Sequence, residues 1–427
     1  MRGWLETSVV ACALLAVFGV GIDRVAFFPD ESEWIATSYY FEAFLDRSAE
    51  PTLWSERYWT LTQPPLCRYI IALGRLAGGY RVGDLNRPWA FSIGDAANIA
   101  RGALPNPRLL WWSRLPMALL AVVSILILFR LVTAAAGRWA AYTLVLLLAA
   151  NPFVYRILCR AMSEAPLLAC TALFALASDA ALAEWQRSVE EPYRSFAAFR
   201  PVAAWFFLAG CVCGLAAAAK LNGFATVPTG LVLCALAAAT HAGKVPMGAR
   251  SVLTAATAGL LLLGTALIFV VLNPYLYVDP LGRTVTLFNH RLLEIQGQLA
   301  SHPNSVIHGM TSRVEIVSRR ILHDFAAMSF PGSLLLNVVL CALGAHFIVR
   351  QAWPWLRGNP TGRTSVVILV VGLGSAAPAL FTPLDWDRYY LLPVIFTTVG
   401  IAVGIAACVT PLLARAREGF APGGVSR

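Results

Sequence analysis

The most regular feature of the chain is a series of apolar stretches, each close to the length of a membrane-crossing helix and each bounded by polar or charged residues. A helix needs about 20 mostly apolar residues to cross the hydrocarbon core of a bilayer. The stretches lie at 7–26, 114–134, 138–155, 163–183, 201–219, 222–240, 251–272, 329–349, 364–382 and 390–412. The pattern predicts an all-α polytopic membrane protein with about ten spans, forming a single transmembrane domain over residues 1–427.

Two of these boundaries need interpretation. The apolar residues between 201 and 240 are too many for one crossing, so two spans are expected to meet at Lys220-Leu221-Asn222-Gly223. The first stretch runs directly into Asp23 and Arg24 without a convincing small-residue cleavage site. It is therefore interpreted as an uncleaved anchor rather than a signal peptide.

Composition excludes the soluble and disordered classes. Only 13% of the residues are charged, about half the share of a soluble domain, and the mean hydropathy is +0.66. The formal net charge of +10 indicates topology signals and headgroup contact, because basic residues at span ends serve those purposes in membrane proteins. No nucleic-acid partner is expected. The nine cysteines show no CxxC or Cys/His ligand spacing, which excludes a disulfide framework and a zinc finger.

The positive charges also predict an orientation. Arginine and lysine gather in alternate short connections and in the C-terminal tail, so the positive-inside rule places both termini in the cytoplasm. The long segments 27–113 and 273–328 then form two non-cytoplasmic loops. Interfacial helices are expected at 30–41 and 64–76, with 81–108 as irregular loop, and no soluble C-terminal domain is expected.

The remaining charges collect at the outer ends of the predicted spans. They are Asp30, Glu31, Glu164, Lys220, Asp279, Asp385, Asp387 and Arg388, with Asn222 beside them. Carboxylates grouped with Arg and Lys suit an anionic, phosphate-bearing substrate and acid–base chemistry. They are also compatible with a divalent metal ion, although the sequence does not require one and no cofactor is certain.

Several short motifs carry a family resemblance. In chain order they are Asp30-Glu31, Thr62-Gln63-Pro64-Pro65-Leu66, Arg114-Leu115-Pro116, Arg160-Ala161-Met162-Ser163-Glu164, and Asp387-Arg388-Tyr389 before Pro393. With these motifs the chain resembles the lipid-phosphate-dependent glycosyltransferases of the GT-C fold, especially the protein O-mannosyltransferase and aminoarabinose-transferase branch (glycosyltransferase family 39). One position departs from the pattern, since Gln63 stands where that family commonly has His.

The resemblance implies a function and assigns roles. The enzyme would move a sugar from a polyprenyl-phosphate donor to a hydroxyl of a protein, lipid or glycan acceptor, with inversion, on the outer face of a bacterial inner or plasma membrane. The donor and membrane lipid are the implied partners. The implied catalytic residues are Asp30, as general base, and Glu31. The donor phosphate would contact Arg388, Lys220 and Tyr389. The acceptor or a metal would be oriented by Glu164, Gln63, Asn222 and His308.

Five of these residues also have a purely structural explanation. Asp30 and Glu31 could cap a helix, and Arg388 could pair with Asp385 or Asp387 of its own loop. Lys220 could extend to the headgroups, and Glu164 could pair with Arg156 or Arg160. The alternative function is a transporter or flippase of a lipid-linked sugar, and a catalytically inactive scaffold remains open. A transporter favours charges near mid-span and paired broken helices.

Overall fold

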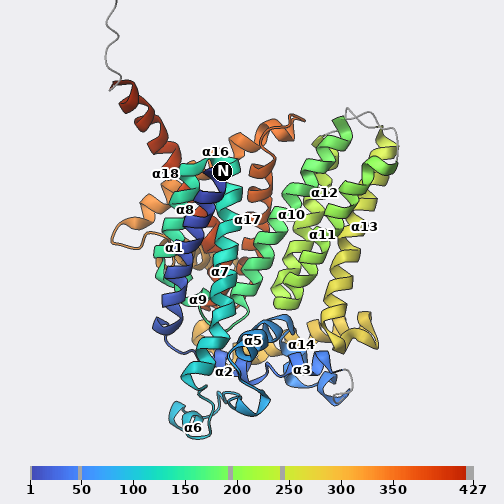
Figure 1. Ribbon diagram of the computed structural model, residues 1–427, viewed down its shortest axis with the longest axis vertical. Helices are drawn as coiled ribbons and strands as arrows, with labels where there is room; N and C mark the ends of the chain where they lie inside the picture. The colour runs from blue at the N-terminus through green and yellow to red at the C-terminus, as the bar shows by residue number, and fades with distance from the viewer. Residues whose placement is uncertain (1, 47–50, 191–195, 241–245, 420–427) are drawn as a thin grey trace, which may run out of the picture.

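The computed structural model describes residues 2–46, 51–190, 196–240 and 246–419. Within them, nine helices are long and apolar enough to cross a membrane, and one bent pair of helices adds a tenth candidate. The nine stand side by side in one bundle (Figure 1) and confirm the polytopic all-α class. They are α1 (Arg2–Arg24), α7 (Pro107–Ala136), α10 (Glu164–Glu190), α11 (Phe196–Ala219), α12 (Thr226–Thr240) together with the short helix η3 (Leu221–Ala225), α13 (Met247–Leu272), α16 (Ser333–Leu356), α17 (Arg363–Phe381) and α18 (Leu391–Gly419).

The stretch expected as a span at 138–155 is helical but bent, and it forms the tenth candidate. That stretch is divided into α8 (Arg138–Ala150) and α9 (Pro152–Leu158), which meet at an angle of 72°. Asn151 causes the break, because its side-chain oxygen accepts hydrogen bonds from the backbone N–H groups of Phe153 (2.9 Å) and Val154 (3.2 Å). Pro152 follows at the first helical position, where its missing N–H costs nothing. The local sequence therefore starts a new helix in a new direction.

The polar break at Lys220 separates two helices, as expected. The backbone leaves α11 at Ala219, takes an extended conformation at Lys220, and passes through the short helix η3 (Leu221–Ala225) into α12. Gly223 permits this turn, because a Cβ atom there would lie 2.1 Å from the carbonyl oxygen of Ala216. The side chain of Lys220 is thereby held at the end of the bundle.

Small residues bring neighbouring spans together, and larger apolar residues face outward. A Cβ atom on Gly210 would lie 2.1 Å from the carbonyl oxygen of Leu261, and one on Gly344 would lie 1.8 Å from that of Gly400. These positions set the close approach of α11 to α13 and of α16 to α18. The outer side of α13 exposes a row of apolar side chains: Val252, Leu262, Leu263, Leu267 and Val271. Such a surface is suited to contact with lipid.

The first outer segment, named for the side of the membrane that the charge pattern predicts, is a cluster of short helices. It contains α2 (Pro29–Ala36), α3 (Tyr40–Leu45), η1 (Pro51–Trp54), α4 (Tyr58–Thr62), α5 (Leu66–Ala77), η2 (Val82–Asp84) and α6 (Asp95–Ala100). The helix expected at 64–76 is confirmed as α5. The single amphipathic helix expected at 30–41 is wrong, because turns at 37–39 separate α2 from α3, and residues 31–36 are all buried. The segment 81–108 is also less irregular than expected, and α7 already begins at Pro107.

Two buried arginines fasten this cluster to α5. Arg68 donates to the hydroxyl of Thr37 (3.0 Å) and to the backbone carbonyl of Trp59 (2.7 Å). Arg75 forms a two-pronged ion pair with Glu42, at 2.5 and 2.6 Å. Because a guanidinium has five donors in a fixed plane, each of these residues fixes the orientation of several segments together.

The second outer segment contains η4 (Pro274–Tyr277), α14 (Pro280–Ser301), η5 (Pro303–Ser305), α15 (Met310–Arg319) and the π-helical turn η6 (Arg320–Asp324). In Figure 1, α14 lies at the same end of the bundle as α2, α3 and α5, while α1 begins and α18 ends at the opposite end. Two backbone hydrogen bonds connect this segment to the loop before α18, from Ile307 to Pro383 (2.9 Å) and from Asp385 to Ser305 (2.8 Å). The two outer segments therefore cover one end of the bundle together.

Candidate functional site

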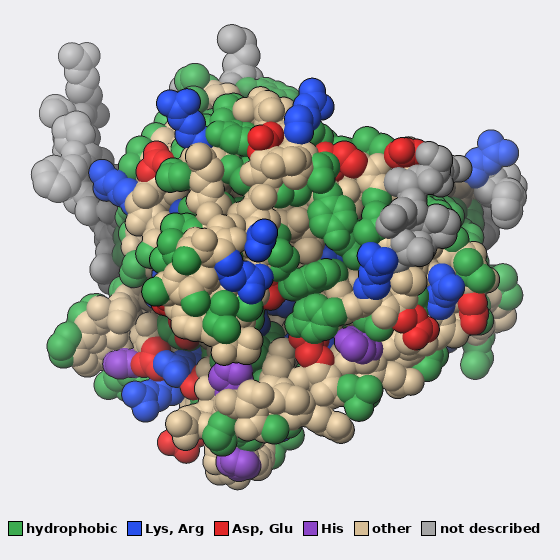
Figure 2. Space-filling view, turned by 90° about the horizontal axis from the view of Figure 1, so that it is seen from below, with side chains coloured by type: hydrophobic (Ala, Val, Ile, Leu, Met, Phe, Trp, Pro, Cys, Tyr) green, Lys and Arg blue, Asp and Glu red, His purple; other side chains and the backbone are tan. Residues whose placement is uncertain are grey.

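A cavity of about 730 Å³ lies between the bundle and these two segments. Its walls come from α2 and α4, the turn before α10, the Lys220 turn, α14, and the loop that leads into the short helix η7 (Asp387–Tyr390) before α18. Figure 2 views this end of the molecule from below and shows acidic, basic and histidine side chains interspersed with apolar ones. The cavity is thus the place where the scarce ionisable groups of the chain converge.

Helix α2 directs its acidic residues to two different sides. Pro29 occupies the first helical position and Asp30 and Glu31 lie in the first turn, where negative charge is favoured by the helix dipole. Asp30 and Glu33 both line the cavity, whereas Glu31 does not. This division follows from helical geometry, since residues three apart share a face and adjacent residues do not.

Glu31 is a buried structural hub. Its carboxylate forms a two-pronged ion pair with Arg114 of α7, with both N–O distances at 2.7 Å, and both side chains are almost fully buried. It also accepts hydrogen bonds from the backbone N–H of Ala161 (2.8 Å) and of Phe28 (3.0 Å). Arg114 in turn donates to the carbonyls at the end of α1, including that of Val25 at 2.7 Å. Glu31 and Arg114 therefore hold α1, α2, α7 and the turn before α10 in register.

Asp30 forms an ion pair with Arg388 of η7. Residues 30 and 388 lie at opposite ends of the sequence, and the resemblance places a proton acceptor at the first and a phosphate ligand at the second. The guanidinium of Arg388 also lies 4.9 Å from the ring centre of Trp386 and 5.8 Å from that of Tyr389. These aromatic contacts add to the attraction of Asp30 in fixing the arginine at the cavity wall.

Glu164 and Lys220 form the second ion pair of the cavity. The ammonium of Lys220 lies 2.7 Å from one carboxylate oxygen of Glu164, while the other oxygen is buried and has no hydrogen-bond partner among the described residues. Lys220 also lies 5.4 Å from the ring centre of Tyr389. Lys220 therefore pairs with Glu164 instead of extending to the headgroups. Glu164 pairs with neither Arg156 nor Arg160.

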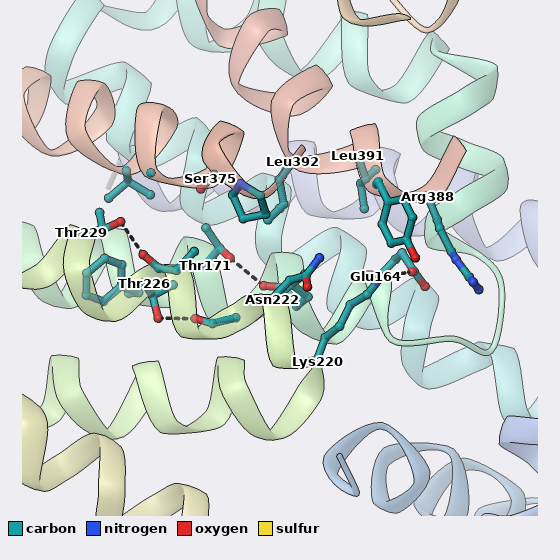
Figure 3. A pocket seen from close by; sticks show the side chains of 18 residues that line it. Glu164, Thr171, Lys220, Asn222, Thr226, Thr229, Ser375, Arg388, Leu391 and Leu392 are labelled. Atoms are coloured by element: carbon teal, nitrogen blue, oxygen red, sulfur yellow. Dashed lines mark hydrogen bonds and ion pairs between the residues drawn. The ribbon is translucent and has the colours of Figure 1, made fainter. Parts of the chain in front are cut away.

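A narrow crevice continues from this point between α10, α12 and α17. Figure 3 shows Glu164, Lys220 and Arg388 at one end of the crevice, and Thr226 and Thr229 toward the other. Asn222 lines both the crevice and the main cavity. The hydroxyls of Thr226 and Thr229 donate to backbone carbonyls of their own turns, at 2.7 Å each. Apolar side chains such as Leu167, Phe174 and Leu392 make up much of the remaining wall.

Of the other residues expected at the site, two line the cavity and one does not. Tyr389 lines the cavity, and its hydroxyl accepts a hydrogen bond from Arg291 (3.3 Å). Gln63 also lines it and accepts from Arg68 (3.1 Å). His308 is exposed and is not part of the cavity wall. No cluster of three or more His, Cys, Asp or Glu side chains suited to a metal ion occurs among the described residues.

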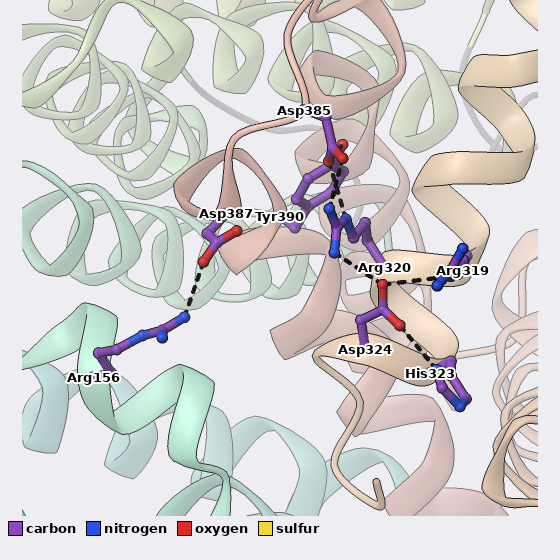
Figure 4. A network of polar contacts seen from close by, with 8 residues as sticks. All are labelled: Arg156, Arg319, Arg320, His323, Asp324, Asp385, Asp387 and Tyr390. Carbon is purple, nitrogen blue, oxygen red and sulfur yellow. Dashed lines mark hydrogen bonds and ion pairs between the residues drawn. The ribbon is translucent and has the colours of Figure 1, made fainter. Parts of the chain in front are cut away.

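Asp385 and Asp387 are not the partners of Arg388. Asp385 pairs with Arg320 (2.6 Å) and accepts from the hydroxyl of Tyr390 (2.9 Å), while Asp387 pairs with Arg156 of α9 (2.9 Å). Figure 4 shows this network, which joins the π-helical turn η6, the loop with η7 before α18, and α9. It fixes the loop that carries Arg388 and leaves that arginine to Asp30.

Three cavity residues have no role in the sequence analysis. Arg291 and Glu294 of α14 form an ion pair at 2.5 Å across one wall, and Glu33 lies one turn after Asp30. The spacing of Glu33 from Asp30 predicts a shared helix face and was the one available signal. Nothing in the sequence indicates that α14 packs on α4, because that contact depends on the tertiary structure.

No protein-family model matches the sequence, and no curated protein matches it. Solved structures are similar in fold. The crystal structure of ArnT from Cupriavidus metallidurans bound to undecaprenyl phosphate matches with 18% identity and a TM-score of 0.50 over 98% of this chain and 64% of that one. The apo structure of the same protein matches with 18% identity and a TM-score of 0.48 over 98% of this chain and 63% of that one.

The protein O-mannosyltransferase Pmt1-Pmt2 complex of S. cerevisiae, solved with its sugar donor, matches with 15% identity and a TM-score of 0.43, over 62% of this chain and 33% of that chain. This chain spans slightly less than two thirds of the length of ArnT. The similarity to the ArnT structure bound to undecaprenyl phosphate establishes that the chain has the GT-C fold of multi-pass integral membrane proteins.

Proposed function

We propose that this protein is a membrane glycosyltransferase that moves a sugar from a polyprenyl-phosphate donor to a hydroxyl acceptor on the non-cytoplasmic face. One observation carries the proposal: Asp30 and Arg388 meet in a large cavity where the Glu164–Lys220 pair opens toward a crevice between candidate membrane spans. A carboxylate for proton removal and cations for a lipid phosphate are thus adjacent. The GT-C fold supports the same reading.

Arg388 and Lys220 are the proposed ligands of the donor phosphate. A guanidinium matches two phosphate oxygens at once, and an ammonium adds a compact charge. Tyr389 lies against both cations and would keep them aligned. The isoprenoid chain would leave along the crevice between α10, α12 and α17, whose wall is largely apolar. The phosphate would then remain at the end of the bundle while the chain stays in the membrane.

The substrate-free pairing of these cations has a mechanistic consequence. Arg388 is occupied by Asp30 and Lys220 by Glu164, so an incoming phosphate must compete with both carboxylates. When the phosphate takes Arg388, Asp30 is released toward the acceptor. Donor binding thus frees the base, and an acceptor hydroxyl meets a competent carboxylate only after the donor is in place.

The proposed reaction is a direct displacement at the anomeric carbon, which inverts its configuration. Asp30 accepts the proton of the acceptor hydroxyl as its oxygen bonds to that carbon. The bond from the carbon to the phosphate oxygen breaks, and its electron pair goes to the phosphate, which Arg388 and Lys220 stabilise. Glu31 acts through position alone, since its oxygens are engaged with Arg114 and the backbone.

The acceptor would be oriented by Glu164, Gln63 and Asn222, which line the cavity. The unpartnered oxygen of Glu164 is available to accept a hydrogen bond from the acceptor hydroxyl. His308 lies outside the cavity wall in this structure, so a role for it requires movement of the second outer segment. A divalent ion would have to be held by the cavity carboxylates together with the donor phosphate.

A transporter or flippase is the alternative function. Within the described residues one span is broken, at the 72° bend between α8 and α9, whereas transporters favour a pair of broken helices at mid-membrane. The ionisable residues of the cavity lie at the ends of the spans. This placement favours chemistry at the surface over passage through the bilayer.

One experiment tests the proposal with Asp30→Asn. Purified protein is incubated with polyprenyl-phosphate sugars and extracted acceptors, and products are measured by mass spectrometry. The variant is expected to lose transfer by about 10²–10⁴-fold, the usual contribution of a general base. It should bind polyprenyl phosphate at least as tightly as the wild type, because Arg388 no longer has a competing carboxylate. Glu315→Gln is the control, since Glu315 is exposed and outside the cavity.

Full transfer by Asp30→Asn would refute its role as base. Weaker binding of polyprenyl phosphate by this variant would refute the competition at Arg388. If the wild type moved the intact lipid-linked sugar across vesicles and made no glycosylated product, the alternative function would replace the proposal.

A further inference from the structure

Glu33 is a buried carboxyl group at the cavity wall that the proposed reaction does not use. The residue is 8% exposed and lines the cavity beside Asp30. Its side chain makes no hydrogen bond or ion pair with any residue that the structure describes. A carboxylate in this position is costly, because burial without a partner disfavours the charged form.

The other carboxylates of the cavity are all compensated. Ion pairs join Asp30 to Arg388, Glu164 to Lys220, Glu294 to Arg291, Asp385 to Arg320 and Asp387 to Arg156. Among the described acidic residues of the wall, Glu33 is therefore the one without a cationic partner. No ion pair lowers the proton affinity of Glu33, so burial can raise it.

The surroundings of Glu33 raise that affinity. Burial raises its pKa to about 8, and the negative charge of Asp30 is the next contribution in the same direction. Glu294, across the cavity on α14, also raises it, whereas Arg388 and Arg68 oppose the shift. Tyr58 of α4 is a further titratable neighbour, and burial raises its pKa to about 12. Glu33 therefore gains and loses its proton near neutral pH.

The geometry connects Glu33 to the base. Asp30 and Glu33 stand one turn apart on the cavity face of α2, where side chains three residues apart have Cβ atoms about 5–6 Å from each other. Two carboxyl groups at that separation can exchange a proton directly or through one water molecule. Glu31 is engaged with Arg114, so Glu33 is the nearest carboxyl group along the helix without an ion pair that could relieve Asp30 of a proton.

We infer that Glu33 is the terminal proton acceptor of the transfer reaction, receiving from Asp30 the proton that Asp30 removes from the acceptor hydroxyl. The inference rests on the proposed function. The proton moves from the hydroxyl to Asp30 as the new glycosidic bond forms, and the electron pair of the broken bond goes to the phosphate. The proton then passes from Asp30 to Glu33, and from Glu33 to solvent when the product leaves.

This step resets the site. As long as Asp30 carries the proton, it cannot pair with Arg388, and the lipid phosphate keeps that arginine. Once Glu33 has taken the proton, Asp30 is charged again and competes with the phosphate for Arg388. Passing the proton to Glu33 therefore assists release of the lipid phosphate and restores the pairing seen in the substrate-free structure.

The test is the pH dependence of turnover in Glu33→Gln. With a pKa of about 8, Glu33 is ionised in about one molecule in ten at pH 7, so wild-type kcat should rise about tenfold between pH 7 and pH 9. Glu33→Gln should lose this rise and have a lower kcat at pH 9, with an unchanged KM for the donor. Glu33→Asp should keep the rise at a reduced kcat. Glu315→Gln provides the matched control.

A wild-type pH profile and kcat in Glu33→Gln would overturn the inference. Retained binding of polyprenyl phosphate establishes that the variant is folded, and a variant that fails this criterion is replaced by Glu33→Asp. Suppose that the wild type transfers the sugar, that Asp30→Asn does not, and that Glu33→Gln behaves as the wild type. This result would leave the proposed function intact and remove this inference alone. A wild type that makes no glycoside removes both.

Discussion

Adjacent residues on one short helix have separate tasks in this protein. Asp30 faces the cavity and pairs with Arg388, while Glu31 is fully buried against Arg114. The sequence shows two consecutive acids and cannot divide their roles, because the division depends on which side of α2 meets α7. The pair that shares the cavity is Asp30 with Glu33, three residues apart.

Replacing Glu31 by Gln should destabilise the fold. It leaves the guanidinium of Arg114 buried without its counter-charge, and breaking a buried pair from one side costs about 3–5 kcal/mol. Thermal unfolding in detergent should show a clear drop in midpoint relative to Glu315→Gln. A midpoint equal to that of the wild type would show that Arg114 is satisfied by the carbonyls of α1 alone.

The shifted pKa of Glu33 should be measurable without substrate. Folding raises its pKa from 4.5 to about 8, so between these values the folded protein holds a proton that the unfolded chain has lost. The contribution is a stability that is present below pH 4.5 and is lost as the pH rises through about 8. The midpoint of thermal unfolding should therefore fall more steeply from pH 5 to pH 9 in the wild type than in Glu33→Gln. Equal slopes would contradict the shift.

At the scale of elements, the site depends on where helices stop. The break at Asn151 turns α9 by 72° away from α8, and this turn brings Arg156 to Asp387 in the loop before α18. The break at Lys220 places an ammonium beside Glu164 at the start of α10. Helix ends, rather than helix interiors, carry the proposed chemistry because charges are less costly there than at mid-membrane.

Substitution of Gly223 by Ala tests the second break. The added Cβ would lie 2.1 Å from the carbonyl oxygen of Ala216, so the turn must open and Lys220 must move. A displacement of about 1 Å in such a site can lower turnover about 10²-fold. Gly259→Ala on α13, where nothing lies within 4 Å, is the control and should behave as the wild type. Comparable transfer rates in the two variants would argue against a positioning role for the turn.

At the scale of the whole molecule, the two outer segments and the loop before α18 close one end of the bundle. α14 packs on α4, and together they face the ends of α10, α11 and α18. The described parts of the N-terminal and C-terminal helices reach the opposite end (Figure 1). This arrangement agrees with the positive-inside pattern, and the outward placement of the cavity follows from that pattern as a prediction.

Cysteine labelling tests the orientation. Ser92 and Thr361 are exposed, the first in the outer segment and the second between α16 and α17. With Cys12 and Cys408 replaced by Ser, Ser92→Cys should react with a membrane-impermeant maleimide added to intact cells. Thr361→Cys should react only after the membrane is opened. The reverse pattern would place the cavity in the cytoplasm.

The sequence by itself determined the class of protein and most of its spans. Hydropathy is local, because about 20 consecutive apolar residues suffice to indicate a crossing, and nine of the ten expected stretches became helices long enough for one. The motifs Asp30-Glu31 and Asp387-Arg388-Tyr389 also indicated, through the family resemblance, Asp30, Arg388 and Tyr389, which line the cavity of the proposed site. The tenth stretch, 138–155, became the bent pair of α8 and α9, because its hydropathy conceals the effect of a capping Asn followed by Pro.

Only the tertiary structure decided which charges meet. Asp30 pairs with Arg388 across 358 positions and Glu31 with Arg114 across 83, and no local pattern encodes such distances. It also left Glu33 without a partner at the cavity wall. The physical reason is that an ion pair is selected by the packing of whole helices, whereas a span is selected by the transfer of its own side chains from water to lipid.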